Sequence, residues 1–242
     1  MPSAAIDVGS NTLRLLIGDI RENTVSRIHT DRAITRLARG MMDSGKLSEE
    51  GIRKSIQVLK AFADSMACHG VSCVKAVGTS ALREAENSEE FIEMVFRETG
   101  IRTEVITGTR EAELTAKGVL IGFRRTDGAL IIDIGGGSTE WIILGGQNTG
   151  ESPVCGSLLL GVVTLLERFI KTDPPSSGEI SSIIREIDLR LLPLKQQSAG
   201  RAVTVTDFIG TGGTITTLSV IDLGMKNYDC QKVHMHAISL QR

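Results

Sequence analysis

The sequence has no run of lysine or arginine longer than two residues, and its formal net charge is −2 over 242 residues. A protein that binds nucleic acid carries a basic stripe, so nucleic-acid binding is not expected and any polyanion must bind locally. The sequence also lacks an apolar segment of about 18 residues, which a membrane-spanning helix needs. No charged region followed by an apolar region precedes the first predicted strand, so we expect neither a secretory signal nor a membrane partner.

Close-spaced cysteines are also missing. The four cysteines, Cys68, Cys73, Cys155 and Cys230, form no pair of the metal-ligand type, so we expect reduced thiols in a cytoplasmic protein. No lysine follows the glycine-rich segments as it does in a P-loop, and no nucleophile elbow is present. P-loop chemistry and covalent serine catalysis are therefore excluded. The hydrophobic content of 41% and charged content of 23% are ordinary for a globular protein.

The most informative segment is glycine-rich and lies in the second half, ALIIDIGGGSTEWIILGG over residues 129–146. An apolar run ends at Asp133, three glycines follow, and Ser138, Thr139 and Glu140 precede a second apolar run. This pattern predicts two strands joined by a tight turn. The glycines let backbone N–H groups approach an anion, and the two acidic residues supply the oxygen ligands that Mg²⁺ prefers. A tight hairpin whose glycines serve only to allow positive φ in the turn would give the same pattern.

A second copy of this segment lies near the N-terminus, AIDVGSNTLRLLI over residues 5–17. Aligning Asp7 with Asp133 needs no gap. Seven residues after each aspartate the charge differs, because Arg14 stands in the first copy and Glu140 in the second. An internal repeat of this kind predicts two related halves, and we expect a cleft between them.

Two other loops that lead into helices have the composition of phosphate-binding loops. In the first, a strand predicted over residues 72–77 is followed by Thr79 and Ser80, with Arg83 one turn later. In the second, a strand predicted over residues 203–209 runs into the segment 210–214, GTGGT, and then a helix. The N-terminus of a helix accepts phosphate through its free N–H groups. Hydroxyl side chains that only cap the first helix would give the same pattern there.

Glu111 lies in the first turn of a helix predicted to follow a strand over residues 103–107. Ligands of α/β sheets gather at the carboxyl ends of strands, so Glu111 is placed for a catalytic base. A glutamate in the first turn also complements the helix dipole, and the local sequence by itself favours that role. Glu113 is expected to point to the other side of the helix.

The rest of the chain completes an alternating α/β pattern. Strands over residues 4–8, 13–20 and 24–30 predict a meander, and a short helical turn is expected within residues 31–42. Ser48 and Ser88 are predicted to cap two helices, the second ending at Gly100. A further strand is predicted near residues 153–155, with helices over 161–170 and 178–192. The polar segment 124–128 is the predicted domain boundary, which gives domains 1–123 and 124–242.

Two groups of residues leave alternatives open. Arg32, Arg36 and Arg39 form either a solvated face or a rim that attracts an anion. His234 and His236 alternate on what we predict to be a strand, but no third metal ligand is evident, so a structural role is expected.

The duplicated hairpins and the late glycine loop resemble the actin/Hsp70/sugar-kinase superfamily. Within it, four motifs in order resemble the Ppx/GppA family of exopolyphosphatases and guanosine pentaphosphate phosphohydrolases: IDVGSNTLRLLI, GTSALREAEN, ITGTREAEL and IDIGGGSTE. The resemblance extends along nearly all of the chain. It implies an α/β fold with two ribonuclease-H-like (actin-like ATPase) domains, each a mixed sheet flanked by helices, with an interdomain cleft. Short members of the family are longer than this chain, so the second domain is expected to be incomplete at its C-terminus.

The resemblance implies a hydrolase that removes the terminal phosphate of inorganic polyphosphate or the 5′-phosphate of pppGpp, with Mg²⁺ or another divalent cation. It implies Glu111 as the base, Arg14 as the residue that stabilises charge, Asp133 and Glu140 as metal ligands, and Glu140 also as a catalytic residue. The residues expected to contact phosphate are Asp7, Gly9, Ser10, Asn11, Thr79, Ser80, Arg83, Gly135, Gly136, Gly137, Ser138, Gly212, Gly213 and Thr214. Polyphosphate or guanosine penta- or tetraphosphate is the expected ligand, and a homodimer stays open.

Two other functions also stay open. An ATP-dependent kinase or ATPase of the same superfamily would need an adenine pocket around residues 210–214 and an aspartate that activates the acceptor, for which the sequence offers no candidate. A regulatory module that binds (p)ppGpp or polyphosphate without turnover is the other alternative.

Overall fold

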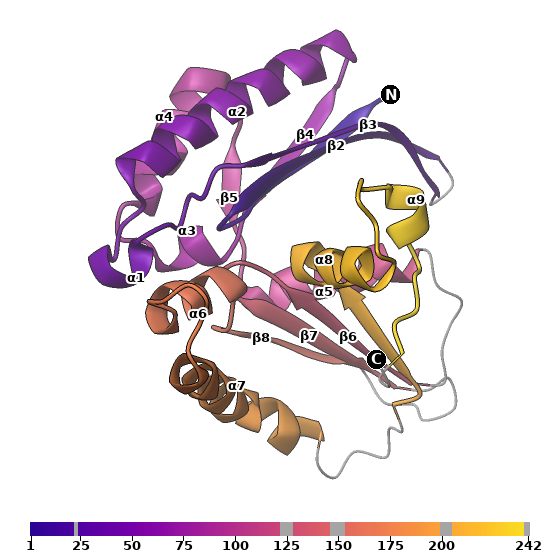
Figure 1. The fold of residues 1–242 in the computed structure, drawn as a ribbon. Coiled ribbons are helices and arrows are strands. Elements are labelled where there is room, and N and C mark those ends of the chain that lie inside the picture. The colour runs from indigo at the N-terminus through magenta and orange to yellow at the C-terminus, as the bar shows by residue number, and fades with distance from the viewer. Residues whose placement is uncertain (22–23, 122–127, 146–152, 199–204, 240–242) are drawn as a thin grey trace. The chain divides into compact units, whose positions relative to one another are not determined.

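Figure 1 shows the ribbon of the computed structural model, which describes residues 1–21, 24–121, 128–145, 153–198 and 205–239. The chain divides into two compact units. Unit 1 consists of Met1–Gly108 and Val163–Ile183, and unit 2 of Thr109–Val162 and Ile184–Arg242. The structure describes each unit separately, so the interdomain cleft stays a prediction. The boundary predicted between residues 123 and 124 lies outside the described residues and also stays a prediction.

Unit 1 is built on a five-stranded sheet in the order β3-β2-β1-β4-β5. Its strands are β1 (Ser3–Val8), β2 (Thr12–Arg21), β3 (Thr24–Ile34), β4 (Cys73–Gly78) and β5 (Thr103–Val105). The first three strands pair antiparallel, which confirms the predicted meander, whereas β4 is parallel to both β1 and β5. β3 continues beyond its predicted end at Thr30, because its pairing with β2 runs on to Thr12 and Ile34. The helical turn expected within residues 31–42 lies later in the chain than expected, as α1 (Met41–Ser44).

Two helices cover one face of this sheet, α2 (Glu49–Cys68) and α4 (Ser88–Thr99) (Figure 1). The predicted cap of α2 is confirmed, since the Ser48 hydroxyl oxygen accepts the N–H of Gly51 at 3.1 Å. The apolar stripe of α2 buries Leu59, Phe62 and Met66 against alternate residues of β1 and β2. The shared core fixes which face of the sheet is buried.

The predicted cap of α4 is wrong by one residue. Ser88 is the first residue of the helix and Asn87 is its N-cap. The Asn87 side chain is hydrogen-bonded to a residue 40 positions earlier in the sequence. Its Oδ1 accepts the N–H of Leu47 at 2.8 Å, and its Nδ2 donates to the Leu47 carbonyl at 3.1 Å. Gly100 ends the helix as predicted, with φ of 73° in the left-handed region that glycine favours.

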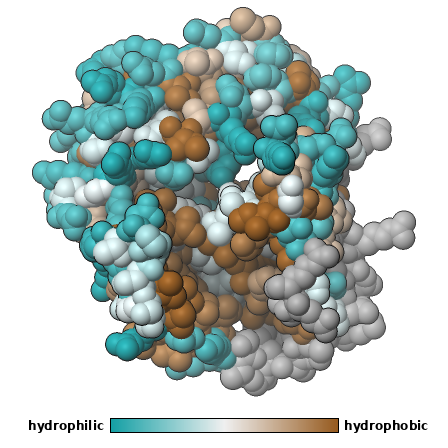
Figure 2. Space-filling model, viewed as in Figure 1, coloured by the Kyte–Doolittle hydropathy of each residue, from teal (hydrophilic) through white to brown (hydrophobic). Residues whose placement is uncertain are grey.

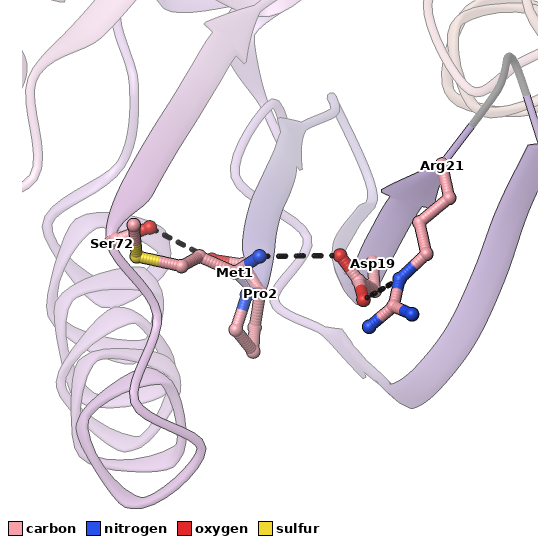
Figure 3. A network of polar contacts seen from close by, with 5 residues as sticks. All are labelled: Met1, Pro2, Asp19, Arg21 and Ser72. Carbon is pink, nitrogen blue, oxygen red and sulfur yellow. Dashed lines mark hydrogen bonds and ion pairs between the residues drawn. The ribbon is translucent and has the colours of Figure 1, made fainter.

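The N-terminus is tied to its neighbours by a small polar network (Figure 3). The Met1 ammonium group lies 3.4 Å from Oδ1 of Asp19, and Nε of Arg21 donates to Oδ2 of Asp19 at 2.9 Å. On the other side of β1, the N–H of Ser72 donates to the Pro2 carbonyl at 3.0 Å. The bond from Arg21 holds the pKa of Asp19 below its ordinary value. The network fastens the start of β1 to β2 and to the segment before β4.

Unit 2 repeats this plan in its sheet, whose order is β8-β7-β6-β9. The strands are β6 (Ala129–Ile134), β7 (Thr139–Leu144), β8 (Val154–Leu158) and β9 (Asp207–Thr211). β6 pairs antiparallel with β7 and parallel with β9, as β1 does with β2 and β4. The predicted repeat is therefore confirmed in the topology of the described strands. β9 extends two residues beyond its predicted end at Ile209.

Two helices are central to unit 2, α5 (Gly108–Leu120) and α8 (Gly212–Asp222). α5 buries Ala112 and Ala116 against the sheet residues Ala129, Ile131 and Ile142. Since β6 and β7 residues two apart share a face, α5 covers the face that also carries Asp133 and Glu140. α8 follows β9 with no intervening loop residue, so the predicted glycine loop is shared between the strand and the helix.

The remaining helices are α6 (Val162–Phe169), α7 (Ser177–Ser198) and the short α9 (Cys230–Val233). The strand predicted for the two histidines is wrong, because His234 is the C-cap residue of α9 and His236 instead contacts Asp222 at 2.7 Å. Hydrophobic residues gather at the surface over α7 and α8 (Figure 2), among them Leu189, Leu192 and Ile221. Within the described residues, no helix combines the length and apolar character needed to cross a membrane.

Candidate active site

The first hairpin places an acidic and a basic side chain directly opposite each other. Asp7 of β1 and Arg14 of β2 are Cα partners, and Nη1 of Arg14 donates to Oδ2 of Asp7 at 2.8 Å. Both stand on the sheet face opposite α2, because Ile6, Val8 and Leu13 point into the core. Removal from water raises the pKa of the Asp7 carboxyl, and the guanidinium of Arg14 acts in the opposite direction.

The turn of this hairpin is tight and partly buried. A Cβ at Gly9 would lie 2.8 Å from the Thr12 carbonyl oxygen, so only glycine fits there. Ser10 is buried, and its carbonyl accepts the N–H of Ala38 at 2.9 Å. Thr79 N–H donates to the Val8 carbonyl at 3.4 Å, which brings the second predicted loop to the end of β1.

The residues predicted around Thr79 are brought close to the first hairpin but not as a long helix. They form α3 (Ser80–Glu84), and Thr79 makes no side-chain capping bond. Thr79 and Ser80 are both buried. Nη1 of Arg83 donates to the Ile106 carbonyl at 3.1 Å, which ties α3 to the end of β5.

The second hairpin places two acidic residues in the same relation. Asp133 of β6 and Glu140 of β7 are Cα partners, as the gap-free alignment with Asp7 and Arg14 predicts. Glu140 is 2% exposed, and its Oε1 accepts the Ser157 hydroxyl at 2.7 Å. Ser157 is its Cα partner on β8. Asp133, Glu140 and Ser157 thus form one row across three strands, on the face that α5 covers.

The glycines of this hairpin make a compact turn. Gly135 N–H donates to the Ser138 carbonyl at 2.9 Å, so this predicted phosphate donor is engaged within the turn. The peptide between Gly136 and Gly137 packs against Gly161, where a Cβ would lie 2.2 Å from the Gly136 carbonyl oxygen. Gly161 is therefore required for the shape of the loop.

The third predicted loop joins this site. Gly212, at φ of 87°, lies against Asp133 so closely that a Cβ there would fall 2.2 Å from Oδ1 of Asp133. The Thr214 hydroxyl donates to the Ile134 carbonyl at 3.0 Å. Gly213 is exposed and has open space beside its Cα. The Asp133 carboxylate therefore meets the first residue of α8, where the helix dipole favours negative charge.

Glu111 occupies the first turn of α5, as predicted, and is half-buried. Its helix starts beside β8, where Sγ of Cys155 lies 3.9 Å from the Thr109 carbonyl oxygen. Cys155 and Ile142 belong to the row of side chains next to the row of Glu140 and Ser157, about 7 Å along the strands. Burial and the charge of Glu113 raise the pKa of the Cys155 thiol. The base implied by the resemblance and the acidic row therefore share one face of the unit 2 sheet.

The acidic row has the chemistry of a divalent-cation site. Carboxylates directly opposite each other on paired strands repel, and a bound cation would remove that cost. Among the described residues no group of three histidine, cysteine, aspartate or glutamate side chains could hold a metal ion. Mg²⁺ does not need one, because it commonly binds through one or two carboxylates together with water and substrate phosphate. Asp133 and Glu140 fit that donor set.

Sequence reasoning missed Ser157 and Gly161. Ser157 lies in β8, and only the pairing of β7 with β8 shows that it faces Glu140. Gly161 lies more than twenty residues after the glycines against which it packs. The only local signals were a polar residue within an otherwise apolar strand and a glycine before a helix.

The fold and the site define a class: a duplicated α/β protein in which each half carries a β-hairpin with a charged pair beside its turn. The chain belongs to the Ppx/GppA phosphatase family, whose sequence model matches residues 16–240. It is 34% identical over 249 residues to exopolyphosphatase 2 of Mycobacterium tuberculosis, a match that covers 97% of this chain and 75% of that protein. It is 32% identical to the guanosine-5′-triphosphate,3′-diphosphate pyrophosphatase of Vibrio vulnificus, over 91% of this chain and 43% of that protein.

Solved structures agree with this assignment. The crystal structure of the Ppx/GppA family member of Aquifex aeolicus is 36% identical in sequence, with a TM-score of 0.73. That match covers 96% of this chain and 72% of the Aquifex chain. The expected α/β class, with two mixed sheets flanked by helices, is confirmed.

Proposed function

We propose that this chain hydrolyses phosphoanhydride bonds, releasing the terminal phosphate of inorganic polyphosphate or the 5′-phosphate of pppGpp. The observation that carries the proposal is the row of Asp133, Glu140 and Ser157 on the face of the unit 2 sheet that the Glu111 helix covers. Membership of a phosphatase family supports the reaction class, and the two relatives named above support the two substrates. A cytoplasmic location remains a prediction. It fits four cysteines that all lie in described residues and form no disulfide.

In unit 2, Glu111 acts as the general base. Its carboxylate accepts the proton of a water molecule as the water oxygen attacks the terminal phosphorus. The new P–O bond forms while the bridging P–O bond breaks, and the bridging oxygen of the shortened polyphosphate chain or of ppGpp takes the electron pair. General base catalysis of this kind contributes about 10²–10⁴-fold to the rate. The loop Gly135–Ser138 and the start of α8 at Gly212 position the phosphate, with the N–H of Gly135 occupied by the turn itself.

Asp133 would hold a divalent cation together with Glu140, its Cα partner on β7. A bound Mg²⁺ would neutralise phosphate charge. Ser157 keeps the buried Glu140 carboxylate oriented by its hydrogen bond. In unit 1, Arg14 contributes positive charge where phosphoryl transfer develops negative charge, and Asp7 holds its guanidinium in place. The substrate-facing roles of Gly9, Ser10, Asn11, Thr79, Ser80 and Arg83 belong to the same proposal.

Phosphate release from long-chain polyphosphate, pppGpp and ATP, measured side by side with Mg²⁺, tests this function. Release from polyphosphate or pppGpp but not from ATP is the expected result. Hydrolysis of ATP alone would favour the kinase or ATPase alternative. Binding of polyphosphate or ppGpp without release from any substrate would indicate the non-catalytic module.

A further inference from the structure

A group of arginines beside the first hairpin loop takes no part in the site described above. Arg32 of β3 is the Cα partner of Arg14, so the two share the sheet face opposite α2 and α4. Both are exposed. The Asp31 carboxylate accepts the backbone N–H of the next residue, Arg32, at 2.7 Å. The row that starts at Asp7 therefore continues with two arginines on adjacent strands.

Arg36 is fixed next to the turn of the same hairpin. The N–H groups of Thr35 and Arg36 both donate to the Asn11 carbonyl, at 3.0 and 3.1 Å. Thr35 and Leu37 on either side are 2% and 0% exposed, whereas Arg36 between them is exposed. The backbone of Arg36 is thus anchored to a loop residue expected to contact phosphate, and its side chain is directed outward by its buried neighbours.

The conformation of Arg36 is unusual for this residue type. Its φ is 54°, in the left-handed region that glycine and asparagine adopt most readily. Residues held in such conformations cluster at functional sites. A turn alone would be better made by glycine, so the shape of the backbone does not account for an arginine here. Beside it, the buried hydroxyl of Thr35 has no hydrogen-bond partner within the part of the chain that the structure describes.

Arg39, the third arginine of the segment, lies on the side of Glu50. Its charge acts on Glu50 at the start of α2, where Lys54 and then Arg39 help to lower the pKa of that carboxyl. Arg32 and Arg36 lie beside the hairpin by geometry, Arg32 as the Cα partner of Arg14 and Arg36 through its bond to the Asn11 carbonyl.

We propose that Arg36, together with Arg32, forms a second phosphate subsite for a polyphosphate chain, outside the one at Gly9–Asn11. The subsite binds a phosphate further from the chain end than the one being released, and it favours long polyphosphate over short. Guanidinium groups suit this ligand because they bind phosphate oxygens in pairs. The inference rests on the proposed function, since it deepens the substrate specificity of the same site.

Kinetics with two chain lengths test the subsite. Arg36→Gln is compared with Arg27→Gln, a matched loss of one positive charge on β3 opposite Gly18, far along the strand from the loop. KM is measured for tripolyphosphate and for long-chain polyphosphate, and affinity for long-chain polyphosphate is measured by calorimetry at several salt concentrations. Arg36→Gln should raise KM and Kd for the long chain about five- to tenfold, as expected for one charge-assisted contact. It should raise KM for tripolyphosphate much less, and Arg36→Lys should recover part of the affinity.

The outcomes separate the two proposals. If wild type releases phosphate neither from polyphosphate of either chain length nor from pppGpp, the proposed function fails, and calorimetry still decides whether Arg36 binds the polyanion. If Arg36→Gln and Arg27→Gln have equal affinity for long polyphosphate, the subsite does not exist. If Arg36→Gln raises KM equally for both chain lengths, Arg36 contacts the reacting phosphate and the inferred chain-length preference is wrong. Circular dichroism of both variants excludes a folding defect as the cause.

Discussion

Replacing Gly161 by alanine should damage the second hairpin loop through backbone contact alone. A Cβ at this position would lie 2.2 Å from the Gly136 carbonyl oxygen, 2.3 Å from its carbon and 2.4 Å from the Gly137 nitrogen. All three are main-chain atoms, so no side-chain rotation relieves the overlap. Either the peptide of Gly136 and Gly137 moves, or the start of α6 moves away from it. Either movement also strains the bond from Val162 N–H to the Gly135 carbonyl, at 3.1 Å.

The expected loss of stability follows from these distances. Overpacking a well-filled site costs about 1–3 kcal/mol, and contact with rigid backbone puts this case near about 3 kcal/mol. With a urea dependence of about 2 kcal/mol per molar, the unfolding midpoint should fall by about 1.5 M. Phosphate release should fall as well, because the displaced peptide belongs to the proposed phosphate loop.

The single tryptophan makes the measurement specific to unit 2. Trp141 is 2% exposed in β7, next to Glu140, so its fluorescence reports the unfolding of that sheet. Gly118→Ala in α5 is the matched control, since no atom beyond the helix's own backbone lies within 4 Å of the added Cβ. Alanine there should stabilise the helix by about 0.5–1 kcal/mol. A midpoint for Gly161→Ala equal to that of wild type would refute the packing argument, and full activity would refute the role of the loop.

Three further predictions concern single carboxylates. Glu111→Gln should lower phosphate release by about 10²–10⁴-fold while leaving polyphosphate affinity near that of wild type in calorimetry, and surviving turnover would show that the base lies elsewhere. Asp133→Asn removes one of two opposed carboxylates, so without metal its Trp141 unfolding midpoint should be equal to or above that of wild type. Added Mg²⁺ should raise the wild-type midpoint and not that of the variant, and an equal rise in both would place the cation elsewhere. Glu179 has its pKa lowered to about 2 by the Thr172 hydroxyl and by the backbone N–H groups of Ser176 and Lys171. Because the folded-state pKa is depressed, the stability lost in Glu179→Gln should be full above about pH 4.5 and should vanish as the pH falls toward about 2. Urea midpoints across that range check this, and a constant difference would contradict it.

The two hairpins could be predicted from sequence because each is a local pattern. Apolar alternation, a glycine turn and a charged residue at fixed spacing lie within residues 5–17 and 129–146, and the register pairs Asp7 with Arg14 and Asp133 with Glu140 as the alignment requires. The long helix after Ser48 is equally local, since its cap and its stripe are adjacent in sequence.

What sequence reasoning missed depends on contacts between distant residues. Asn87 rather than Ser88 is the N-cap residue, and its amide is hydrogen-bonded to Leu47, forty residues earlier. Ser157 becomes part of the site only when β8 pairs with β7 in one particular register. The alternation of His234 and His236 is a strand pattern by period, but the segment follows the short helix α9, and the His236 ring bonds Asp222 at the end of α8. Periodicity cannot distinguish these outcomes, because tertiary contacts decide them.

The charge difference between the two hairpins gives the duplication a functional meaning. In unit 1 the pair is complete in itself, because Arg14 neutralises Asp7 at 2.8 Å. In unit 2 the same two positions hold Asp133 and Glu140, and proximity of like charges costs free energy unless a cation or hydrogen bonds compensate. Ser157 satisfies one oxygen of Glu140. Under the proposed function, the first copy would supply positive charge through Arg14, whereas the second would bind a cation through Asp133 and Glu140.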